Sequence, residues 1–246
     1  MKSIIRGFSA PTEFLLIIFV CFGLTLTACS VWIINHLYTP QMHTVGTLHS
    51  GSNDVMHLTN DGIVVSVVIQ LITVGIALWI GRIRGWSLAT FGLQVSWKWT
   101  GLGVLLFFAF QLVVHLVHLL MTGSFFAASD PHSTPAFLRV SHLTIPFIIL
   151  ISTVNPVFEE AIESGYFFHA LQRYGMWLTI FAAALFRGFL HVTMGLNGFV
   201  TMFAMGLLYG FVYWRWRQLW PLIIAHSLEM FYALLPQSLA DHALRP

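Results

Sequence analysis

The feature that most constrains this chain is a series of seven long apolar segments separated by polar connections. A membrane-spanning helix needs roughly 20 mostly apolar residues, and each segment reaches or approaches that length. They comprise residues 14–38, 63–80, 101–121, 145–171, 176–194, 199–214 and 219–235. Charged residues make up 8% of the sequence, against about 25% in soluble globular proteins. The sequence therefore predicts an all-α, polytopic membrane helix bundle of about seven spans and excludes a water-soluble domain and a nucleic-acid binder.

The basic residues predict how these spans are oriented. With the N-terminus in the cytoplasm, eight of the eleven Lys and Arg residues fall on the inner side. They are Lys2, Arg6, Arg82, Arg84, Lys98, Arg173, Arg215 and Arg217. Two, Arg139 and Arg245, fall outside, and the polar stretch 39–62 has neither Lys nor Arg. Because cytoplasmic connections are enriched in Lys and Arg, we expect a cell-membrane protein with a cytoplasmic N-terminus and an external C-terminus.

Several ionisable side chains lie inside predicted spans. An ionised group at the centre of a membrane helix costs about 2.5–3.5 kcal/mol, so these groups must pair, protonate or face water. Such residues are functional candidates by default. The carboxylates and the basic groups near them are Glu159, Glu160 and Glu163 in the fourth segment, Arg187 and His191 in the fifth, and His226 and Glu229 in the seventh.

These residues are expected at similar depths. At 1.5 Å per residue, Glu159 lies about 21 Å from Arg173, and His191 about 22 Å from Met176. His226, about 14 Å above Arg217, meets them if its helix tilts or starts late. Pro156, three residues before Glu159, removes a backbone donor and is expected to kink the helix and open a polar cavity beside the carboxylates.

A purely structural interpretation competes with the functional one at some of these positions. Glu163 and Arg187 form a pair that would lock two helices together without chemistry. His115 and His118, three apart in the third segment, fit helix packing better than ligation. Glu159, Glu160, His191 and His226 fit a packing role least, because neighbouring carboxylates repel each other.

Two carboxylates and two histidines in a dry site suit the activation of water. A glutamate then acts as general base, one histidine shares the proton, and another polarises a carbonyl or holds its developing oxyanion. The sequence lacks His-Glu-x-x-His, Gly-x-Ser-x-Gly and an intramembrane Asp pair, which are the signatures of other hydrolytic routes.

Three motifs resemble those of the CPBP family, the CAAX prenyl proteases and bacteriocin-processing proteases also called Abi. That family carries Glu-Glu-x-x-x-Arg, Phe-x-x-x-His and His-x-x-x-Asn/Asp on successive helices. Here these motifs correspond to residues 159–164 (EEAIES), 187–191 (RGFLH) and 226–230 (HSLEM). The resemblance covers roughly residues 89–235 and is sharpest over 150–230.

By this resemblance, Glu159 is the water-activating base, His191 its partner, His226 a carbonyl or oxyanion ligand, and Glu160 a structural carboxylate. Three positions depart from the family: Ser164 replaces its Arg, Arg187 its Phe and Met230 its Asn or Asp. We predict that Arg187 replaces the missing cation by pairing with Glu160 or Glu163, and that Glu229 substitutes for the side chain lost at Met230.

The sequence thus predicts an intramembrane endopeptidase that cleaves a membrane-associated peptide, of the prenylated or the bacteriocin and signal type. Residues 1–100 would supply two anchors and a cytoplasmic connector, and 101–246 the CPBP-like catalytic membrane domain. The glutamate mechanism requires no cofactor, and a divalent metal is left open. One alternative is a catalytically weakened membrane immunity or interaction protein. A second is a proton-coupled transporter, which should show paired broken helices in two related halves, whereas this chain has one predicted Pro-kinked span and no repeat.

Overall fold

The computed structural model describes residues 10–38, 56–83, 85, 88–123, 138–140 and 143–243. Most of the predicted external stretch 39–62 and both chain ends lie outside these residues, so the orientation of the termini stays a prediction. The long helices are α2 (Ala10–Tyr38), α3 (Asn60–Ile83), α4 (Trp97–Thr122), α5 (Ile145–Glu159), α7 (Met176–Leu190), α8 (Gly195–Trp216) and α9 (Trp220–Ala243). Short elements are α6 (Phe167–Leu171), a π-helix (Glu160–Tyr166) and 3₁₀ turns at Leu88–Phe91, Gln172–Tyr174 and Val192–Met194.

The predicted all-helical membrane bundle is confirmed. Six helical stretches are long and apolar enough to span a membrane, and they correspond to six of the seven predicted segments. The exception is the fifth, where the helix α7 has 15 residues and gives way to a 3₁₀ turn after His191. Two strands of three residues each, β1 (Met56–Leu58) and β2 (Leu138–Val140), pair in parallel with Met56 opposite Leu138, which the sequence did not predict.

The outer surface of the bundle is apolar, as a bilayer requires. Large hydrophobic side chains on several helices are exposed, among them Leu24 (78%), Phe108 (62%) and Leu120 (84%). A soluble monomer rarely exposes such continuous apolar area. Together with the six candidate spans, this surface identifies a multi-pass membrane protein.

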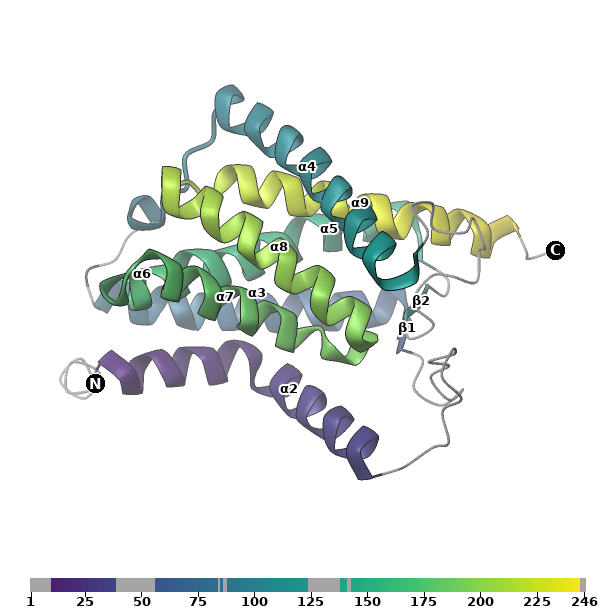
Figure 1. Cartoon of the computed structure of the whole chain (residues 1–246), viewed down its shortest axis with the longest axis horizontal. Helices are drawn as coiled ribbons and strands as arrows, with labels where there is room; N and C mark the ends of the chain where they lie inside the picture. The colour runs from purple at the N-terminus through teal and green to yellow at the C-terminus, as the bar shows by residue number, and fades with distance from the viewer. Residues whose placement is uncertain are drawn as a thin grey trace.

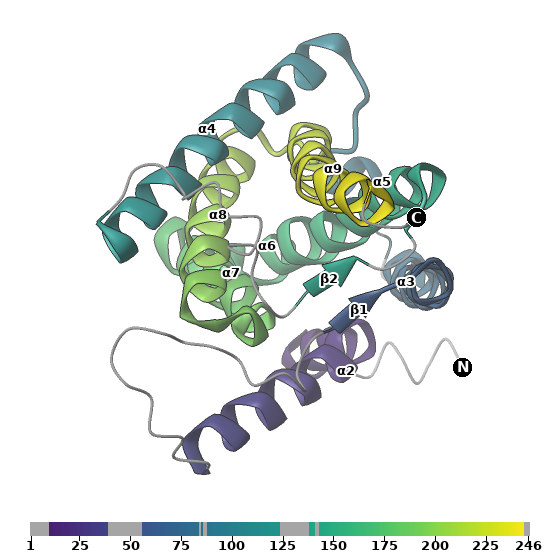
Figure 2. The same ribbon diagram turned by 90° about the vertical axis from the view of Figure 1, so that its right-hand side faces the viewer.

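The helices α2 and α4 lie on opposite sides of the bundle, with α5 to α9 between them (Figures 1 and 2). The helix α7 packs along α8, and α9 is flanked by α4 and α5. Small residues allow these close approaches: a Cβ on Gly206 of α8 would lie 2.6 Å from the Cα of Ala184 on α7. The helix α3 packs against α5, which brings the N-terminal half of the chain to the charged residues.

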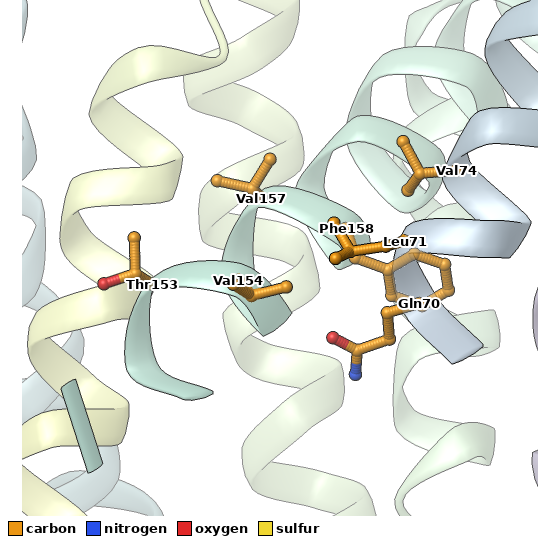
Figure 3. Close-up of a pocket in the computed structure, with 7 residues that line it drawn as sticks. All are labelled: Gln70, Leu71, Val74, Thr153, Val154, Val157 and Phe158. Carbon is orange, nitrogen blue, oxygen red and sulfur yellow. The ribbon is translucent and has the colours of Figure 1, made fainter. Parts of the chain in front are cut away.

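A hollow of about 150 Å³ lies between α3 and α5 (Figure 3). Its lining is almost entirely apolar and consists of Gln70, Leu71, Val74, Thr153, Val154, Val157 and Phe158. None of the charged residues of the spans lines it. This hollow is therefore distinct from the polar cavity that the sequence predicted beside the carboxylates.

Candidate active site

A change of helix type positions the three glutamates of the fourth span. The helix α5 runs through Pro156 and ends at Glu159, and a π-helix begins at Glu160. The N–H of Phe167 accordingly bonds to the carbonyl of Ile162, five residues back. Such π segments are rare and occur frequently at functional sites. Here the segment keeps Glu160, Glu163 and Ser164 buried inside the bundle.

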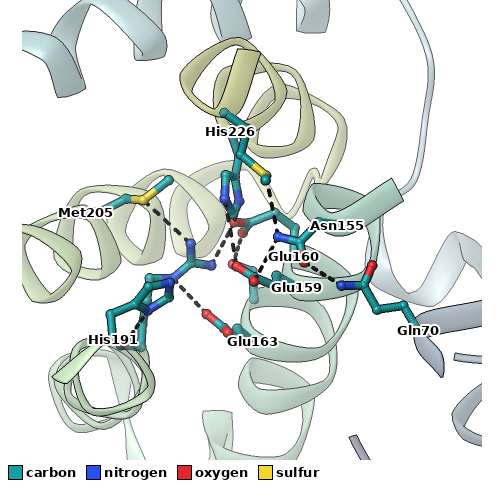
Figure 4. A network of polar contacts seen from close by, with 11 residues as sticks. Gln70, Asn155, Glu159, Glu160, Glu163, His191, Met205 and His226 are labelled. Atoms are coloured by element: carbon teal, nitrogen blue, oxygen red, sulfur yellow. Dashed lines mark hydrogen bonds and ion pairs between the residues drawn. The ribbon is translucent and has the colours of Figure 1, made fainter. Parts of the chain in front are cut away.

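Glu160 is sealed and fully hydrogen-bonded. Its side chain has no exposed surface. Arg187 donates from an Nη atom to Oε1 at 2.7 Å, and Ser164 donates from Oγ to Oε2 at 2.6 Å. Nδ1 of His226 lies 2.9 Å from Oε1 (Figure 4). With these contacts Glu160 is a structural anchor that joins α7, α9 and its own helix.

Arg187 bridges two of the glutamates, as the sequence predicted. Besides its contact with Glu160, its Nε lies 2.9 Å from Oε2 of Glu163. Neither carboxylate oxygen of Glu163 has a hydrogen-bond partner, so this second contact is an ion pair without an aligned hydrogen bond. The guanidinium also lies over the ring of Tyr209, 5.6 Å from its centroid. Arg187 thus supplies a cation to both buried carboxylates.

His226 lies between the two adjacent glutamates. Its Nδ1 faces Glu160, and its Nε2 lies 3.7 Å from Oε2 of Glu159. An ionised carboxylate can only accept a hydrogen bond, and Glu160 is held beside Arg187, so Nδ1 carries the proton. In the neutral ring, Nε2 then carries a lone pair and lies 3.7 Å from Oε2 of Glu159.

Glu159 differs from Glu160 in having an unoccupied oxygen. Its Oε1 accepts a hydrogen bond from Nδ2 of Asn155 at 2.9 Å, whereas Oε2 has no hydrogen-bond partner. The Glu159 side chain is 15% exposed, although Oε2 itself is buried. Of the two carboxylates, Glu159 therefore offers the free acceptor.

His191 ends α7 beside Arg187. Its Nδ1 lies 2.9 Å from the Arg187 carbonyl oxygen, which fixes the ring at the helix end. Within the described residues, no hydrogen bond or ion pair joins His191 to Glu159, although His191 lies within electrostatic range of both Glu159 and His226. The structure thus brings His226, rather than His191, into direct proximity with Glu159.

Glu229 points to a different neighbour. Nε2 of Gln111 on α4 donates to its Oε2 at 3.0 Å, and the next residue, Met230, receives a contact from Asn155 to its sulfur at 3.5 Å. The structure therefore does not bring Glu229 to Glu159 and His226, where it was expected to substitute for the family residue at Met230.

One of the comparisons with known proteins finds a match in the part of the chain that carries the site. Residues 141–231 match the family model described as type II CAAX prenyl endopeptidase Rce1-like. This segment is therefore similar to the CAAX proteases. Every charged residue and histidine assigned to the site from the sequence lies within that segment. No curated protein and no solved structure matches the chain.

A resident metal has little support in this CAAX-protease segment. Among the residues that the structure describes, no group of three or more His, Cys, Asp and Glu side chains is arranged to hold a metal ion. The oxygens of Glu160 are already occupied by Arg187, Ser164 and His226. We therefore derive no step through a metal.

Three polar residues of the site were not predicted from the sequence. Asn155 lies one turn before Glu159 on the same helix, a spacing that could have been noticed. Gln70, on α3, donates from Nε2 to Oδ1 of Asn155 at 2.6 Å. No local sequence pattern links these two positions. Tyr209 is buried with its hydroxyl unpaired, and it resembles an ordinary core aromatic in the sequence.

Proposed function

We propose that the protein is an intramembrane endopeptidase in which Glu159 activates water. The observation that carries this proposal is the unequal state of two adjacent glutamates. Glu160 is enclosed with every oxygen occupied, while Glu159 keeps Oε2 free and directed toward Nε2 of His226. A general base needs an unoccupied acceptor within reach of the proton that it removes.

The proposed step follows from these two acceptors. A water molecule donates one O–H to Oε2 of Glu159 and the other to Nε2 of His226, which lie 3.7 Å apart. Its oxygen attacks the peptide carbonyl as Glu159 takes the proton. The tetrahedral intermediate then expels the amine, which receives that proton from Glu159. The products are a carboxylic acid and an amine, and Glu159 returns to its starting state.

The substrate that we propose is a prenylated peptide with a C-terminal Cys-a-a-X sequence. Support comes from the family description, type II CAAX prenyl endopeptidase, and from an apolar outer surface that a membrane-anchored peptide can approach within the bilayer. Farnesyl and geranylgeranyl groups on such cysteines anchor peptides to membranes.

The test is hydrolysis of a farnesylated Cys-a-a-X peptide by protein reconstituted in nanodiscs. We expect Glu159→Gln to lower kcat by about 10²–10⁴-fold, the usual contribution of a general base, because the amide cannot accept the proton. Glu229→Gln is the matched control, since Glu229 is also an intramembrane glutamate but contacts Gln111. It should keep kcat within about twofold, and both variants should retain the wild-type melting temperature.

The alternative of an inactive interaction protein makes the opposite prediction. It is motivated by the departures from the family at Ser164, Arg187 and Met230. Under that hypothesis, wild-type protein cleaves neither farnesylated nor unmodified peptides. Turnover by Glu159→Gln at the wild-type rate would instead assign the base to another residue.

A further inference from the structure

A polar chain runs from α3 into the candidate site. Nε2 of Gln70 donates to Oδ1 of Asn155 at 2.6 Å, and Nδ2 of Asn155 donates to Oε1 of Glu159 at 2.9 Å (Figure 4). Gln70 lies outside the segment that matches the CAAX protease family. The N-terminal half of the chain therefore contacts the free glutamate through a single intermediary.

The hydrogen bonds between Gln70, Asn155 and Glu159 have a fixed donor-to-acceptor direction. An asparagine amide has one end that accepts and one that donates. Because Gln70 donates to the carbonyl end, the amino end of Asn155 must face Glu159. If Asn155 were turned over, its Oδ1 would face the Glu159 carboxylate, and two acceptors would meet. The Glu159 carboxylate requires the amino end of Asn155, which also contacts the Met230 sulfur at 3.5 Å, and Gln70 supports this orientation by donating to Oδ1.

Holding Oε1 determines what the other oxygen can do. With Oε1 bound to Asn155, the carboxylate plane is fixed and Oε2 is left toward His226, 3.7 Å from Nε2. Catalytic groups need this kind of support, because small displacements of a reacting group cost much of the rate. The sealed neighbour Glu160 obtains its orientation from Arg187 and Ser164, whereas Glu159 obtains it from this chain.

Of these hydrogen-bonded residues, Gln70 is the furthest from Glu159. Its burial argues against an accidental contact. Its side chain is 9% exposed within a helix whose other faces are largely apolar. Polar side chains often join membrane helices by hydrogen bonds that stabilise helix packing. That role alone would be met by any contact between α3 and α5. It does not require the contact to end on the free glutamate.

We propose that Gln70 is a positioning residue for Glu159, acting through Asn155, so that α3 forms part of the proteolytic site. This inference rests on the proposed function in its kinetic consequence but not in its geometry. It predicts that the isosteric changes Gln70→Met and Asn155→Leu both reduce kcat while leaving KM nearly unchanged.

The kinetic experiment uses the farnesylated peptide and the reconstituted full chain. Loss of one hydrogen bond to a charged group is expected to lower kcat by about tenfold in Asn155→Leu and about three- to tenfold in Gln70→Met. Because Gln70 acts through Asn155, the double variant should be no slower than Asn155→Leu alone. Multiplied effects in the double variant would overturn the proposal.

Thr73→Val is the matched control. Thr73 lies one turn further along α3 and has the same 9% exposure as Gln70. Its Oγ1 donates only to carbonyls of its own helix, those of Ile69 and Gln70, at 3.0 Å each. It should keep kcat within about twofold. An equal loss of kcat in Thr73→Val would show that any disturbance of α3 lowers the turnover rate. It would refute a specific role for Gln70.

A structural measurement decides the proposal even if no peptide is cleaved. In a structure of Gln70→Met, we expect Asn155 to release Glu159 and the Glu159 side chain to change rotamer, while Thr73→Val keeps the 2.9 Å contact. An unchanged Glu159 in Gln70→Met would overturn the positioning role. An inactive wild-type protein with a displaced Glu159 in the variant would instead contradict the endopeptidase function and leave the positioning intact.

Discussion

Two adjacent glutamates of one helix have opposite environments in this protein. Around Glu160, a guanidinium, a hydroxyl and an imidazole form a sealed ionic cluster with Glu163. Around Glu159, neutral amides form an open branch that leaves one oxygen unoccupied. One glutamate is thus fully bonded to other side chains, while its neighbour keeps an oxygen without a hydrogen bond. The sealed cluster is expected to govern stability, and the open branch is expected to govern turnover.

The largest effect on stability should follow from removing the cation of the sealed cluster. Arg187→Phe leaves the buried carboxylates Glu160 and Glu163 without their cation. Removal of one member of a buried ion pair typically costs about 3–5 kcal/mol, and we expect a loss of that size in the free energy of unfolding. Reversible unfolding in mixed micelles measures it. A variant as stable as wild type would show that the cluster does not govern stability.

A second substitution should restore much of that loss. Arg187→Phe combined with Ser164→Arg returns both positions to the family pattern and places a cation one turn from Glu160. We expect about half or more of the lost stability to return, because the unpaired charge is the main source of the penalty. The control is Arg187→Phe with Glu163→Gln, which removes a charge and adds none. If the control recovers more than the double reversion, Glu163 rather than Glu160 was the partner that mattered.

Glu163→Gln alone should have a smaller effect. Glu163 forms an ion pair with Arg187 at 2.9 Å but makes no aligned hydrogen bond, and Glu160 still neutralises the guanidinium. We expect stability to change by about 1 kcal/mol or less, with kcat retained within about threefold. Unfolding measurements on Glu163→Gln beside Glu160→Gln separate the two carboxylates. Equal losses would contradict the ranking.

The open branch should contribute least to stability. Asn155→Leu removes the hydrogen bond with Gln70 on α3 and the longer contact with the Met230 sulfur on α9, and interhelical hydrogen bonds in membrane proteins average about 0.6 kcal/mol. We expect the unfolding free energy to fall by no more than about 1 kcal/mol, although the same variant slows turnover. A loss comparable to that of Arg187→Phe would remove the distinction between the two regions.

The charged residues and histidines inside the spans were the most predictable part of the site. Charged groups in apolar segments pointed to Glu159, Glu160, His191 and His226, and the cation missing at Ser164 pointed to Arg187 as the replacement. The match over residues 141–231 supports the resemblance to the CAAX proteases. The catalytic roles of these residues remain predictions.

Contacts that depend on how helices are arranged were not predictable. Glu229 lies three residues after His226, about 60° away around the helix, and α9 is flanked by α4 and α5. Side chains so placed diverge to different neighbours, and Glu229 meets Gln111 instead of the site. Gln70 was missed for a related reason, because its partner Asn155 is 85 positions away in the sequence.

The shortness of α7 links the site to the thickness of the membrane. With 15 residues, the helix extends about 22 Å, while the hydrocarbon core of a bilayer is about 30 Å thick. Its C-terminal end contacts α2, where Sγ of Cys29 donates to the carbonyl of Leu190 at 3.4 Å. Hydrophobic mismatch of this kind is relieved by local thinning of the lipid around the short element. We therefore expect a thin bilayer to place His191 closer to the aqueous phase than a thick bilayer does, which turnover measured in lipids of different chain length can test.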